Sequence, residues 1–551
     1  MNKKVCSFPI LFALLALLIG TCAVVFPASA QAAPTSTGSI TVSGTVASSY
    51  DAYQIFSANV VDGDSDAKIA TDLAWASDAV RDAALPVLHS AGMPNSQTTA
   101  QEAAEWLNTD SHLTSALSAQ LARSLQCSGA VLVALNAGTT AELPCGYWLI
   151  VADDDAIAQG EAGTAPIMAL VGGSAVTVKP KAATPKVAKH VLEDSTAAWQ
   201  KAADATVADD LYWRLSATVP AGLTAYDTYT VRFVDTMSAG LDPSKVAASM
   251  RVYVTAGADG SFDAVATGKD GRAGTKPAKG WTDITAQCAT EVAADGTFTV
   301  CTGDLIAALG GADAFTAGAR VVAVYNAPLN SACNHGIAKG NPNEVYLRYP
   351  RSPFADQSGD AGFTRTPSDD ACAYTWDLAL TKRGSDGDKP LAGAVLSIAD
   401  DRGRTLAADG TWDAEGKATV TTGEDGRVTV SGVDSGKLEV RELKAPKGYT
   451  AFEGTRSVTV KAEGLDVDQV AAAKPKLTIT AESPLRADSA DGSTGSLEAS
   501  LINTPANVPP RGFMPSTGDM AMYAAAAAAV AGAALIVVAL LVKRGGGSHK
   551  E

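Results

Sequence analysis

The chain has 551 residues, enough for three or four domains. Its formal net charge of −16 argues against a nucleic-acid partner, because an acidic surface repels phosphate and instead keeps an extracellular protein soluble. No G-x-S-x-G, H-E-x-x-H or P-loop motif occurs in the sequence, so a secreted enzyme has little support.

The N-terminus predicts a secretory signal peptide over residues 1–30. Two lysines precede an apolar stretch at residues 8–26, and residues 28–30 read Ala-Ser-Ala, an A-x-A cleavage site. Residues 30–32 (Ala-Gln-Ala) offer an equally good cleavage site. A lipoprotein anchored at Cys22 is the alternative, but the threonine before this cysteine matches a lipobox poorly.

Six cysteines remain after the signal peptide, an even number that suggests disulfides in an exported chain. Six cysteines allow fifteen connectivities, and we expect neighbours in the chain to pair because they share a domain. The expected pairs are Cys127 with Cys145, Cys288 with Cys301, and Cys333 with Cys372. No two have C-x-x-C spacing and the five histidines are scattered, so we expect no metal and no cofactor.

Residues 36–181 are predicted to form a β-rich domain with a helical insertion. Apolar and polar residues alternate at 50–56, and strand-like segments return at 146–151 and 167–171. Residues 67–125 are rich in Ala, Leu, Glu and Gln, which favour helix. The phrase Tyr-Asp-Ala-Tyr-Gln-Ile-Phe at 50–56 resembles the N-terminal domain of Gram-positive fimbrial backbone proteins.

This domain ends in Val-Thr-Val-Lys-Pro-Lys at residues 176–181, followed by an Ala/Thr/Pro linker. The phrase resembles the pilin motif of sortase-built pili, Val-x-Val-Tyr-Pro-Lys, with Lys179 in the tyrosine position. The resemblance implies that Lys181 is the nucleophile that receives an acyl group from another subunit. An exposed, flexible domain boundary suits a lysine that an enzyme must reach. Lys179 and Lys186 remain alternative acceptors, and a solvated basic linker is the competing interpretation.

Residues 183–355 show recurrent strand-like phrases separated by turn signals such as Asp259-Gly260 and Asp295-Gly296, the pattern of an all-β sandwich. Three phrases, at 185–191, 229–235 and 341–347, resemble the isopeptide-forming domain of fimbrial proteins.

This resemblance implies that Lys189 is an attacking amine, Asp235 a proton-shuttling acid and Asn343 the amide partner. Lys186 and Asn341 lie next to these residues in the sequence and compete for the same roles. The first domain has no lysine in its strand at residues 39–42, so we expect no such bond there.

Residues 373–505 closely resemble a collagen-adhesin B-type (Cna-B) domain. Its phrases lie at 376–382, 438–449 and 501–505, and the middle phrase matches the E-box of pilins. The resemblance implies the roles of amine, acid and amide for Lys382, Glu442 and Asn503.

Amide formation from lysine and asparagine needs a neutral amine, because an ammonium group has no lone pair for attack. Burial disfavours the charged forms of both amine and carboxylic acid, so a buried cluster can supply a nucleophile and a proton donor. The released product is ammonia, and no cofactor is required. The protein is therefore expected to be no enzyme, apart from this reaction on itself.

The C-terminus predicts a membrane span at 520–542, about 34 Å long as a helix, followed directly by Lys543 and Arg544 on the cytoplasmic side. The preceding pentapeptide resembles the LPxTG sorting signal of Gram-positive surface proteins. It consists of Met514, Pro515, Ser516, Thr517 and Gly518. The resemblance implies that a sortase cleaves between Thr517 and Gly518 and transfers the threonyl group to an amine through a thioester. A bare membrane anchor over residues 514–551 is the alternative.

The expected fold class is therefore all-β, with tandem Ig-like sandwich domains of Cna-A and Cna-B type. The expected function is that of a major subunit of a covalent, wall-anchored pilus that supports adhesion. Its expected partners are sortase, other copies of the chain, minor pilins and peptidoglycan, with possible host or bacterial ligands. The alternative is a monomeric wall-anchored adhesin.

Overall fold

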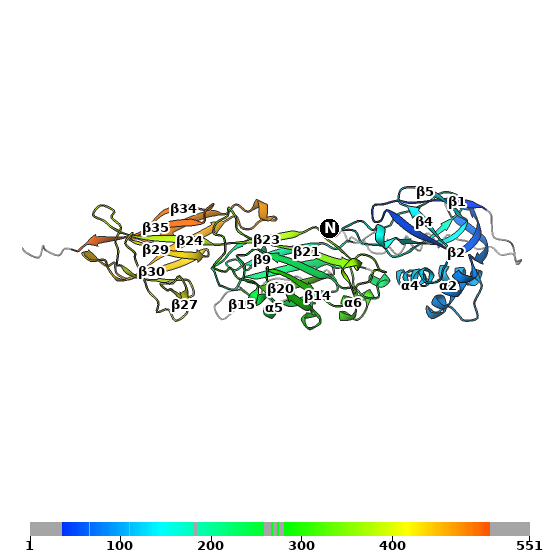
Figure 1. Cartoon of the computed structure of the whole chain (residues 1–551), viewed down its shortest axis with the longest axis horizontal. Helices are drawn as coiled ribbons and strands as arrows, with labels where there is room; N and C mark the ends of the chain where they lie inside the picture. Colours follow the sequence, from blue (N-terminus) through cyan, green and yellow to red (C-terminus); the bar gives the residue numbers. More distant parts are fainter. Residues whose placement is uncertain are drawn as a thin grey trace, which may run out of the picture.

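The computed structural model describes residues 36–506, except for 65–66, 110, 181–183, 222 and most of 258–279. Three β-rich regions follow one another along the long axis of the molecule (Figure 1). We call them the N-terminal region (36–180), the middle region (184–374) and the C-terminal region (375–506). The all-β prediction is confirmed, with few helices in the described chain.

The N-terminal region has two hydrophobic cores. Its two sheets enclose one core, and its helices cover the other. The five-stranded sheet has the order β3-β2-β6-β7 with β4 beside β2, and the three-stranded sheet has the order β5-β1-β8. The strands are β1 (Thr37–Val42), β2 (Ser49–Asp62), β3 (Lys68–Trp75), β4 (Leu132–Asn136), β5 (Thr140–Pro144), β6 (Gly146–Ala152), β7 (Ile167–Val171) and β8 (Val176–Val178). Strand β6 is buried along its whole length because it has a core on each face.

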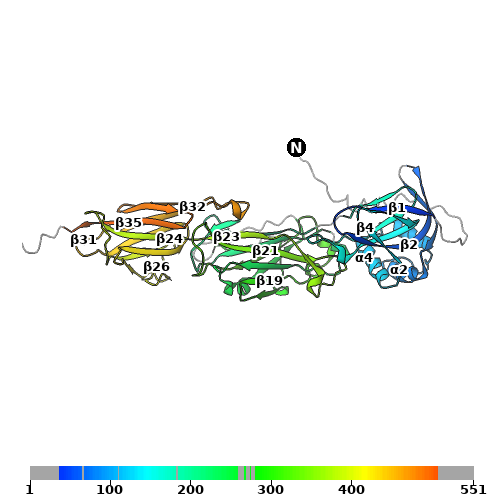
Figure 2. The ribbon, with the colours of Figure 1, turned by 45° about the horizontal axis from the view of Figure 1, so that its top comes forward.

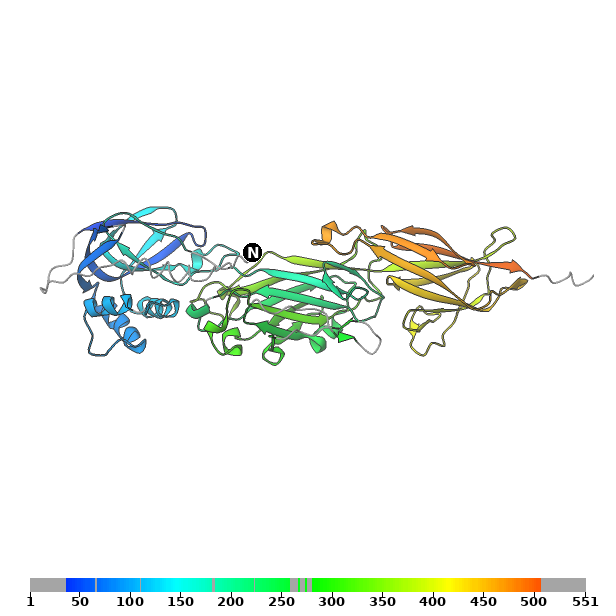
Figure 3. The ribbon, with the colours of Figure 1, turned by 180° about the vertical axis from the view of Figure 1, so that it is seen from behind.

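The expected helical insertion is present, but it starts later than the sequence predicts. Residues 68–75 form β3, which pairs antiparallel with β2, and helices follow only from residue 78. The helices α2 (Asp78–Ser90), α3 (Ala100–Asn108) and α4 (Ser115–Gln126) begin after Ser77, Thr99 and Thr114, whose hydroxyls accept backbone N–H groups. Figure 3 shows them gathered against one side of the sheets.

Two sheets pack face to face in the middle region. Their orders are β10-β9-β12-β20-β14-β17 and β11-β23-β21-β13-β19-β18, with β22 beside β21. The strands are β9 (Val187–Glu193), β10 (Ala198–Gln200), β11 (Ala202–Asp204), β12 (Tyr212–Thr218), β13 (Arg232–Met237), β14 (Arg251–Thr255), β17 (Thr282–Asp283), β18 (Ala289–Val292), β19 (Thr297–Cys301), β20 (Arg320–Asn326), β21 (Asn341–Pro350), β22 (Phe363–Arg365) and β23 (Asp369–Tyr374). Strands β15 (Ala266–Thr267) and β16 (Ala273–Gly274) pair with each other in a separate two-stranded sheet. Two short helices, α5 (Val246–Ser249) and α6 (Leu305–Ala308), flank the sheets. Strands β22 and β23 extend this unit beyond residue 355.

The C-terminal region also has two sheets around one core. Their orders are β29-β24-β35-β31 with β34 beside β35, and β27-β26-β25-β30-β32-β33 with β28 beside β25. The strands are β24 (Trp376–Gly384), β25 (Val395–Ala399), β26 (Thr405–Leu406), β27 (Trp412–Asp413), β28 (Val420–Thr421), β29 (Arg427–Val433), β30 (Gly436–Lys444), β31 (Tyr449–Thr450), β32 (Thr455–Glu463), β33 (Lys476–Ala481), β34 (Leu485–Asp491) and β35 (Ser496–Pro505). The first and last strands, β24 and β35, lie side by side and run parallel. Figure 2 shows β35 leading to the end of the molecule opposite the N-terminal region.

Polar contacts join the N-terminal region to the middle region. The guanidinium group of Arg123 donates to the carbonyl oxygens of Ala225 and Pro353 at 3.1 and 3.2 Å and lies over the ring of Phe354. The Tyr349 hydroxyl donates to the Gly160 carbonyl at 2.7 Å. These contacts hold α4 and the segment after β6 against the middle region.

The three expected disulfides are not present in this structure, in which the six cysteines are free thiols. Cys127 is exposed at the end of α4, whereas Cys145 is buried in the core beneath the helices. Cys333 contacts His335, and Cys372 lies against Gly340 and Tyr374. The order of the cysteines along the chain therefore did not identify pairs that are bonded in this structure.

No helix in the described part of the chain is long and apolar enough to cross a membrane. The predicted span at 520–542, the sorting motif and the signal peptide lie outside the described residues.

Candidate functional site

The middle region contains a buried cluster formed by Lys189, Asp235 and Asn343. Lys189 lies on β9 in one sheet, and the other two lie on the adjacent strands β13 and β21 of the facing sheet. All three side chains are fully buried. The alternating patterns of the strands explain this placement, because each of the three occupies a position that faces the core.

The Lys189 amine contacts Asp235 Oδ2 directly and donates to the Tyr325 hydroxyl at 2.9 Å. Asn343 Nδ2 donates to the same hydroxyl at 2.8 Å, and that hydroxyl donates to Asp235 Oδ2 at 3.1 Å. The amine also lies over the rings of Trp213 and Tyr325, at 5.6 and 5.5 Å from their centroids. The amine, acid and amide that were predicted from separate stretches of sequence are thus brought together.

Burial controls the protonation of this cluster. Desolvation lowers the pKa of Lys189 to about 8, although the Asp235 carboxylate opposes that shift. Desolvation also raises the pKa of Asp235, against the effect of the nearby amine. Both shifts favour a neutral amine beside a protonated carboxylic acid, which are the forms required for attack on an amide.

The two sequence competitors are placed differently. Lys186 is exposed. Asn341 is buried, but its amide nitrogen donates to the carbonyls of Asn334 and Ala373, and its oxygen accepts from Asn334 N. Asn341 therefore holds the turn before β21 and does not face Lys189.

The C-terminal region contains a second cluster, formed by Lys382, Glu442 and Asn503. Lys382 and Asn503 lie on the adjacent strands β24 and β35, and Glu442 reaches them from β30 in the facing sheet. The side chains of Lys382 and Glu442 are fully buried. A buried charge is costly unless it is paired, and in both clusters the lysine amine lies beside a carboxyl group.

The three side chains of this cluster contact one another directly. The Lys382 amine contacts Asn503 Oδ1 and lies 3.1 Å from Glu442 Oε1, and Asn503 Nδ2 donates to that same oxygen at 2.9 Å. The second carboxylate oxygen accepts the Phe452 backbone N–H at 3.1 Å, which fixes its orientation. Desolvation lowers the pKa of Lys382 to about 8, while Glu442 acts in the opposite direction.

The predicted residues of the pilin motif and the sorting signal are either exposed or outside the described residues. Lys179 is exposed just before the end of the N-terminal region, whereas Lys181 lies outside the described residues. Met514, Pro515, Ser516, Thr517 and Gly518 also lie outside them. Within the described part of the N-terminal region, Ser57 and Ser118 are the buried polar side chains, and no lysine is buried there.

Sequence reasoning missed Tyr325, which contacts all three residues of the middle cluster. In the sequence it is only the last aromatic residue of the strand-like run at 321–325. The inward-facing pattern of β20 places it in the core, and a buried hydroxyl needs a hydrogen-bonding partner.

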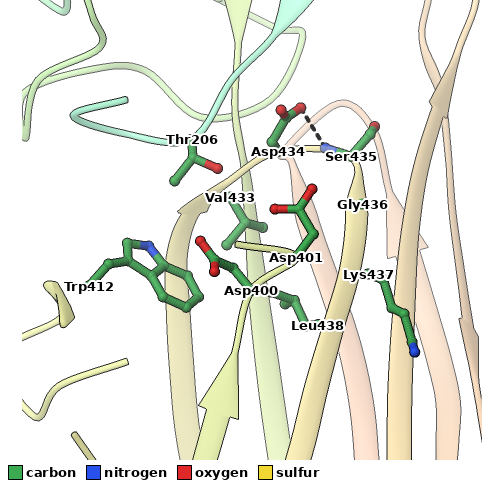
Figure 4. Close-up of a pocket in the computed structure, with 10 residues that line it drawn as sticks. All are labelled: Thr206, Asp400, Asp401, Trp412, Val433, Asp434, Ser435, Gly436, Lys437 and Leu438. Atoms are coloured by element: carbon green, nitrogen blue, oxygen red, sulfur yellow. Dashed lines mark hydrogen bonds between the residues drawn. The ribbon is translucent and has the colours of Figure 1, made fainter. Parts of the chain in front are cut away.

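A third polar site lies where the middle and C-terminal regions meet (Figure 4). It is lined by Thr206, Asp400, Asp401, Trp412, Val433, Asp434, Ser435, Gly436, Lys437 and Leu438. The carboxylate of Asp400 pairs with Arg404 at 2.7 Å, and Asp434 accepts the Ser435 N–H at 2.6 Å. No group of side chains in the described chain has the arrangement of a metal site. Because Thr206 belongs to the middle region and the other lining residues belong to the C-terminal region, the pocket lies at the joint between the two regions.

Comparison with known proteins gives one family match within the chain. Residues 377–474 match the SpaA family, described as a prealbumin-like fold domain. The chain is also 30% identical over 143 residues to the trypsin-resistant surface T6 protein of Streptococcus pyogenes serotype M6. The match covers 24% of this chain and 24% of that relative.

Solved structures with similarity include two pilins. The T6 backbone pilin of Streptococcus pyogenes serotype M6 has 17% identity and a TM-score of 0.46, covering 85% of this chain and 98% of that chain. The full-length major pilin SpaD of Corynebacterium diphtheriae has 15% identity and a TM-score of 0.41, with coverages of 85% and 98%.

Proposed function

We propose that this protein is the major structural subunit of a covalently polymerised pilus anchored to the cell wall. The observation that carries the proposal is the pair of buried lysine–carboxyl–asparagine clusters, one in each of two tandem regions. Such clusters suit a shaft protein, because a covalent tie across strands carries tension that hydrogen bonds alone would not withstand. The similarity to the T6 surface protein and the SpaA match of residues 377–474 support this proposal.

Each cluster would form an isopeptide bond. The neutral lysine attacks the asparagine amide carbon, the carboxyl group supplies and recovers a proton, and ammonia leaves. In the C-terminal cluster the amine already contacts the amide oxygen, and in the middle cluster the amine and the amide nitrogen meet at the Tyr325 hydroxyl. Effective molarities of about 10⁵–10⁸ M become available to well-aligned groups. A neutral acid and a neutral amine held in a dry core therefore need no cofactor.

The two bonds would cross-link different pairs of strands, one between sheets and one within a sheet. A bond between Lys189 and Asn343 would join the two facing sheets of the middle region, because β9 and β21 belong to different sheets. A bond between Lys382 and Asn503 would join the first and last strands of the C-terminal region within one sheet. By the loop-entropy model, a closed loop of about 100 residues contributes roughly 4.7 kcal/mol.

The domains in this proposal are Ig-like sandwiches of Cna-A and Cna-B type. Their limits follow the sequence at 36–181 and 183–355, with the second domain extended through β23 (Asp369–Tyr374), so that the third domain covers 375–505 instead of 373–505. The signal peptide at 1–30 directs secretion, and the sorting signal at 514–551 holds the chain in the membrane until a sortase acts. Ligand binding to host or bacterial surfaces and attachment of minor pilins follow from this role.

Polymerisation would join Thr517 of one subunit to Lys181 of the next, with the last subunit transferred to peptidoglycan. Lys181→Ala should abolish the high-mass ladder on a denaturing gel of cell-wall extracts, because the acceptor amine is missing. Lys179→Ala and Lys186→Ala are matched controls that keep Lys181 and should retain the ladder. A single band from the unmodified chain would instead favour the monomeric wall-anchored adhesin.

A further inference from the structure

Tyr325 occupies the centre of the middle cluster. Its hydroxyl oxygen lies 2.9 Å from Lys189 Nζ, 3.1 Å from Asp235 Oδ2 and 2.8 Å from Asn343 Nδ2. The side chain is fully buried, and Phe298 packs edge-on against its ring at a centroid distance of 4.8 Å. The hydroxyl is therefore held in contact with both reacting nitrogen atoms and with the acid.

The two clusters differ in how the acid reaches the amide. In the C-terminal cluster, Asn503 Nδ2 donates directly to Glu442 Oε1 at 2.9 Å, so the acid touches the nitrogen that must leave. In the middle cluster, Asn343 Nδ2 donates to the Tyr325 hydroxyl, and that hydroxyl donates in turn to Asp235. The phenol thus stands in the position between acid and amide that no group occupies in the other cluster.

We propose that Tyr325 is a catalytic residue that relays a proton from Asp235 to the leaving nitrogen of Asn343. The proposal rests on the isopeptide chemistry proposed above and assigns a further residue to it. A phenol suits this role because its oxygen accepts one hydrogen bond while its O–H donates another. Desolvation and the neighbouring Asp235 raise the pKa of Tyr325, so the phenol remains protonated between proton transfers.

The proton balance of the step is closed. The neutral Lys189 amine attacks Cγ of Asn343, which forms the new C–N bond and a tetrahedral centre. The Tyr325 O–H, which donates to Asp235 before the reaction, turns to the lone pair that the tetrahedral centre creates on Asn343 Nδ2. Asp235 then passes its proton to Tyr325 as Tyr325 passes its own proton to Asn343 Nδ2, and the C–N bond to that nitrogen breaks with release of ammonia. The proton lost by the Lys189 nitrogen returns to Asp235. Tyr325 and Asp235 end in their starting forms.

The test compares the rate of each bond in the full-length chain. Cells expressing the chain are sampled at intervals after a pulse of synthesis, and digests are analysed by mass spectrometry for both cross-linked peptide pairs. Tyr325→Phe keeps the ring and removes only the hydroxyl. We expect the Lys189–Asn343 link to form about 10²-fold more slowly, the lower end of the usual range for acid–base catalysis. The Lys382–Asn503 link in the same molecules should keep its normal rate.

Two controls make the result decisive. Tyr349→Phe removes another buried hydroxyl of the middle region, one that donates to the Gly160 carbonyl, and should leave both links unaffected. Asn343→Ala gives the reference state of an unlinked middle region. A normal rate of the Lys189–Asn343 link in Tyr325→Phe would overturn the relay. If the Tyr325→Phe chain is degraded while the Asn343→Ala chain persists, the relay is also overturned, because the hydroxyl would then be needed for folding and not for the reaction. Absence of this link from the unmodified chain would refute the proposed function instead.

Discussion

Two lysines of this protein lie at positions where burial makes their charged form unfavourable. Lys189 and Lys382 are completely buried, and burial lowers the pKa of each to about 8. An ordinary core position would hold an apolar side chain, because a buried amine costs several kcal/mol unless it is paired. The proposed reaction with an asparagine would remove the titrating amine and leave a neutral amide in its place.

The acid of the C-terminal cluster can be tested alone. Glu442→Ala should prevent the Lys382–Asn503 bond, because no other group in the described structure touches both the amine and the leaving nitrogen. The purified variant should therefore retain one ammonia, about 17 Da, relative to a fully linked chain. Glu439→Ala, an exposed residue of the same strand β30, is the matched control and should remain linked. A linked Glu442→Ala chain would remove Glu442 from the mechanism.

The sequence predicted these two clusters because their residues lie in recognisable phrases on alternating strands. The structure brings Lys189, Asp235 and Asn343 together around the Tyr325 hydroxyl. It also brings together Lys382, Glu442 and Asn503. Tyr325 could not be predicted, because its role depends on β12 lying between β9 and β20 and on the facing sheet. Of the expected disulfide pairs, Cys288 and Cys301 lie near each other, directly before strand β18 and at the end of the paired strand β19, but no disulfide joins them in the structure.

At the level of elements, the joint between the middle and C-terminal regions is formed by strand β11 and the segment after it. Strand β11 pairs parallel with β23, which leads directly into β24. Asp204 at its end accepts from Trp376 Nε1 at 2.6 Å and from Ser435 N at 3.0 Å. Val207 N donates to the Gly432 carbonyl at 2.9 Å. These pairings join residues that are far apart in the sequence, so local sequence patterns could not predict them.

A buried acid beside this joint predicts a dependence of stability on pH. Desolvation and the nearby Asp204 raise the pKa of Glu193 to about 8, from an ordinary value of 4.5. The folded chain therefore holds a proton that the unfolded chain loses between those values. The contribution of Glu193 to stability is therefore fully present below about pH 4.5 and is lost as the pH rises through 8.

Glu193→Gln should abolish that part of the pH dependence, because the amide cannot ionise. Thermal unfolding of the soluble chain between pH 5 and 9 measures the effect, with a higher midpoint expected for the variant at pH 8–9. Glu291→Gln, an exposed residue of β18, serves as the control and should follow the unmodified chain. Identical pH profiles for Glu193→Gln and the unmodified chain would contradict the assignment.

The whole molecule is a row of three regions joined by polar contacts on both sides of the middle region (Figure 1). Beside the second joint, Asp209 accepts from Arg404 through two bonds of 2.6 and 2.9 Å and pairs with Arg402 at 3.3 Å. Bidentate pairs of this kind fix orientation as well as distance. The arrangement suits a stiff shaft segment.

Asp209→Ala should loosen the second joint, because it leaves two arginines without their shared partner. The cost should be about 2 kcal/mol, as for hydrogen bonds to charged groups. Small-angle X-ray scattering should give a broader distribution of overall lengths than for the unmodified chain. Lys417→Ala, which removes an exposed pair with Glu415, is the control. Unchanged scattering would mean that the backbone pairings alone hold the joint.

The most direct test of the account is peptide mass spectrometry of the protein purified from the wall of its own cells. The account predicts two internal cross-linked pairs, Lys189 with Asn343 and Lys382 with Asn503, each about 17 Da lighter than the separate peptides, and a branched peptide joining Thr517 to Lys181. Recovery of the same peptides with all four lysine and asparagine side chains unmodified, and with no branched peptide, would contradict it.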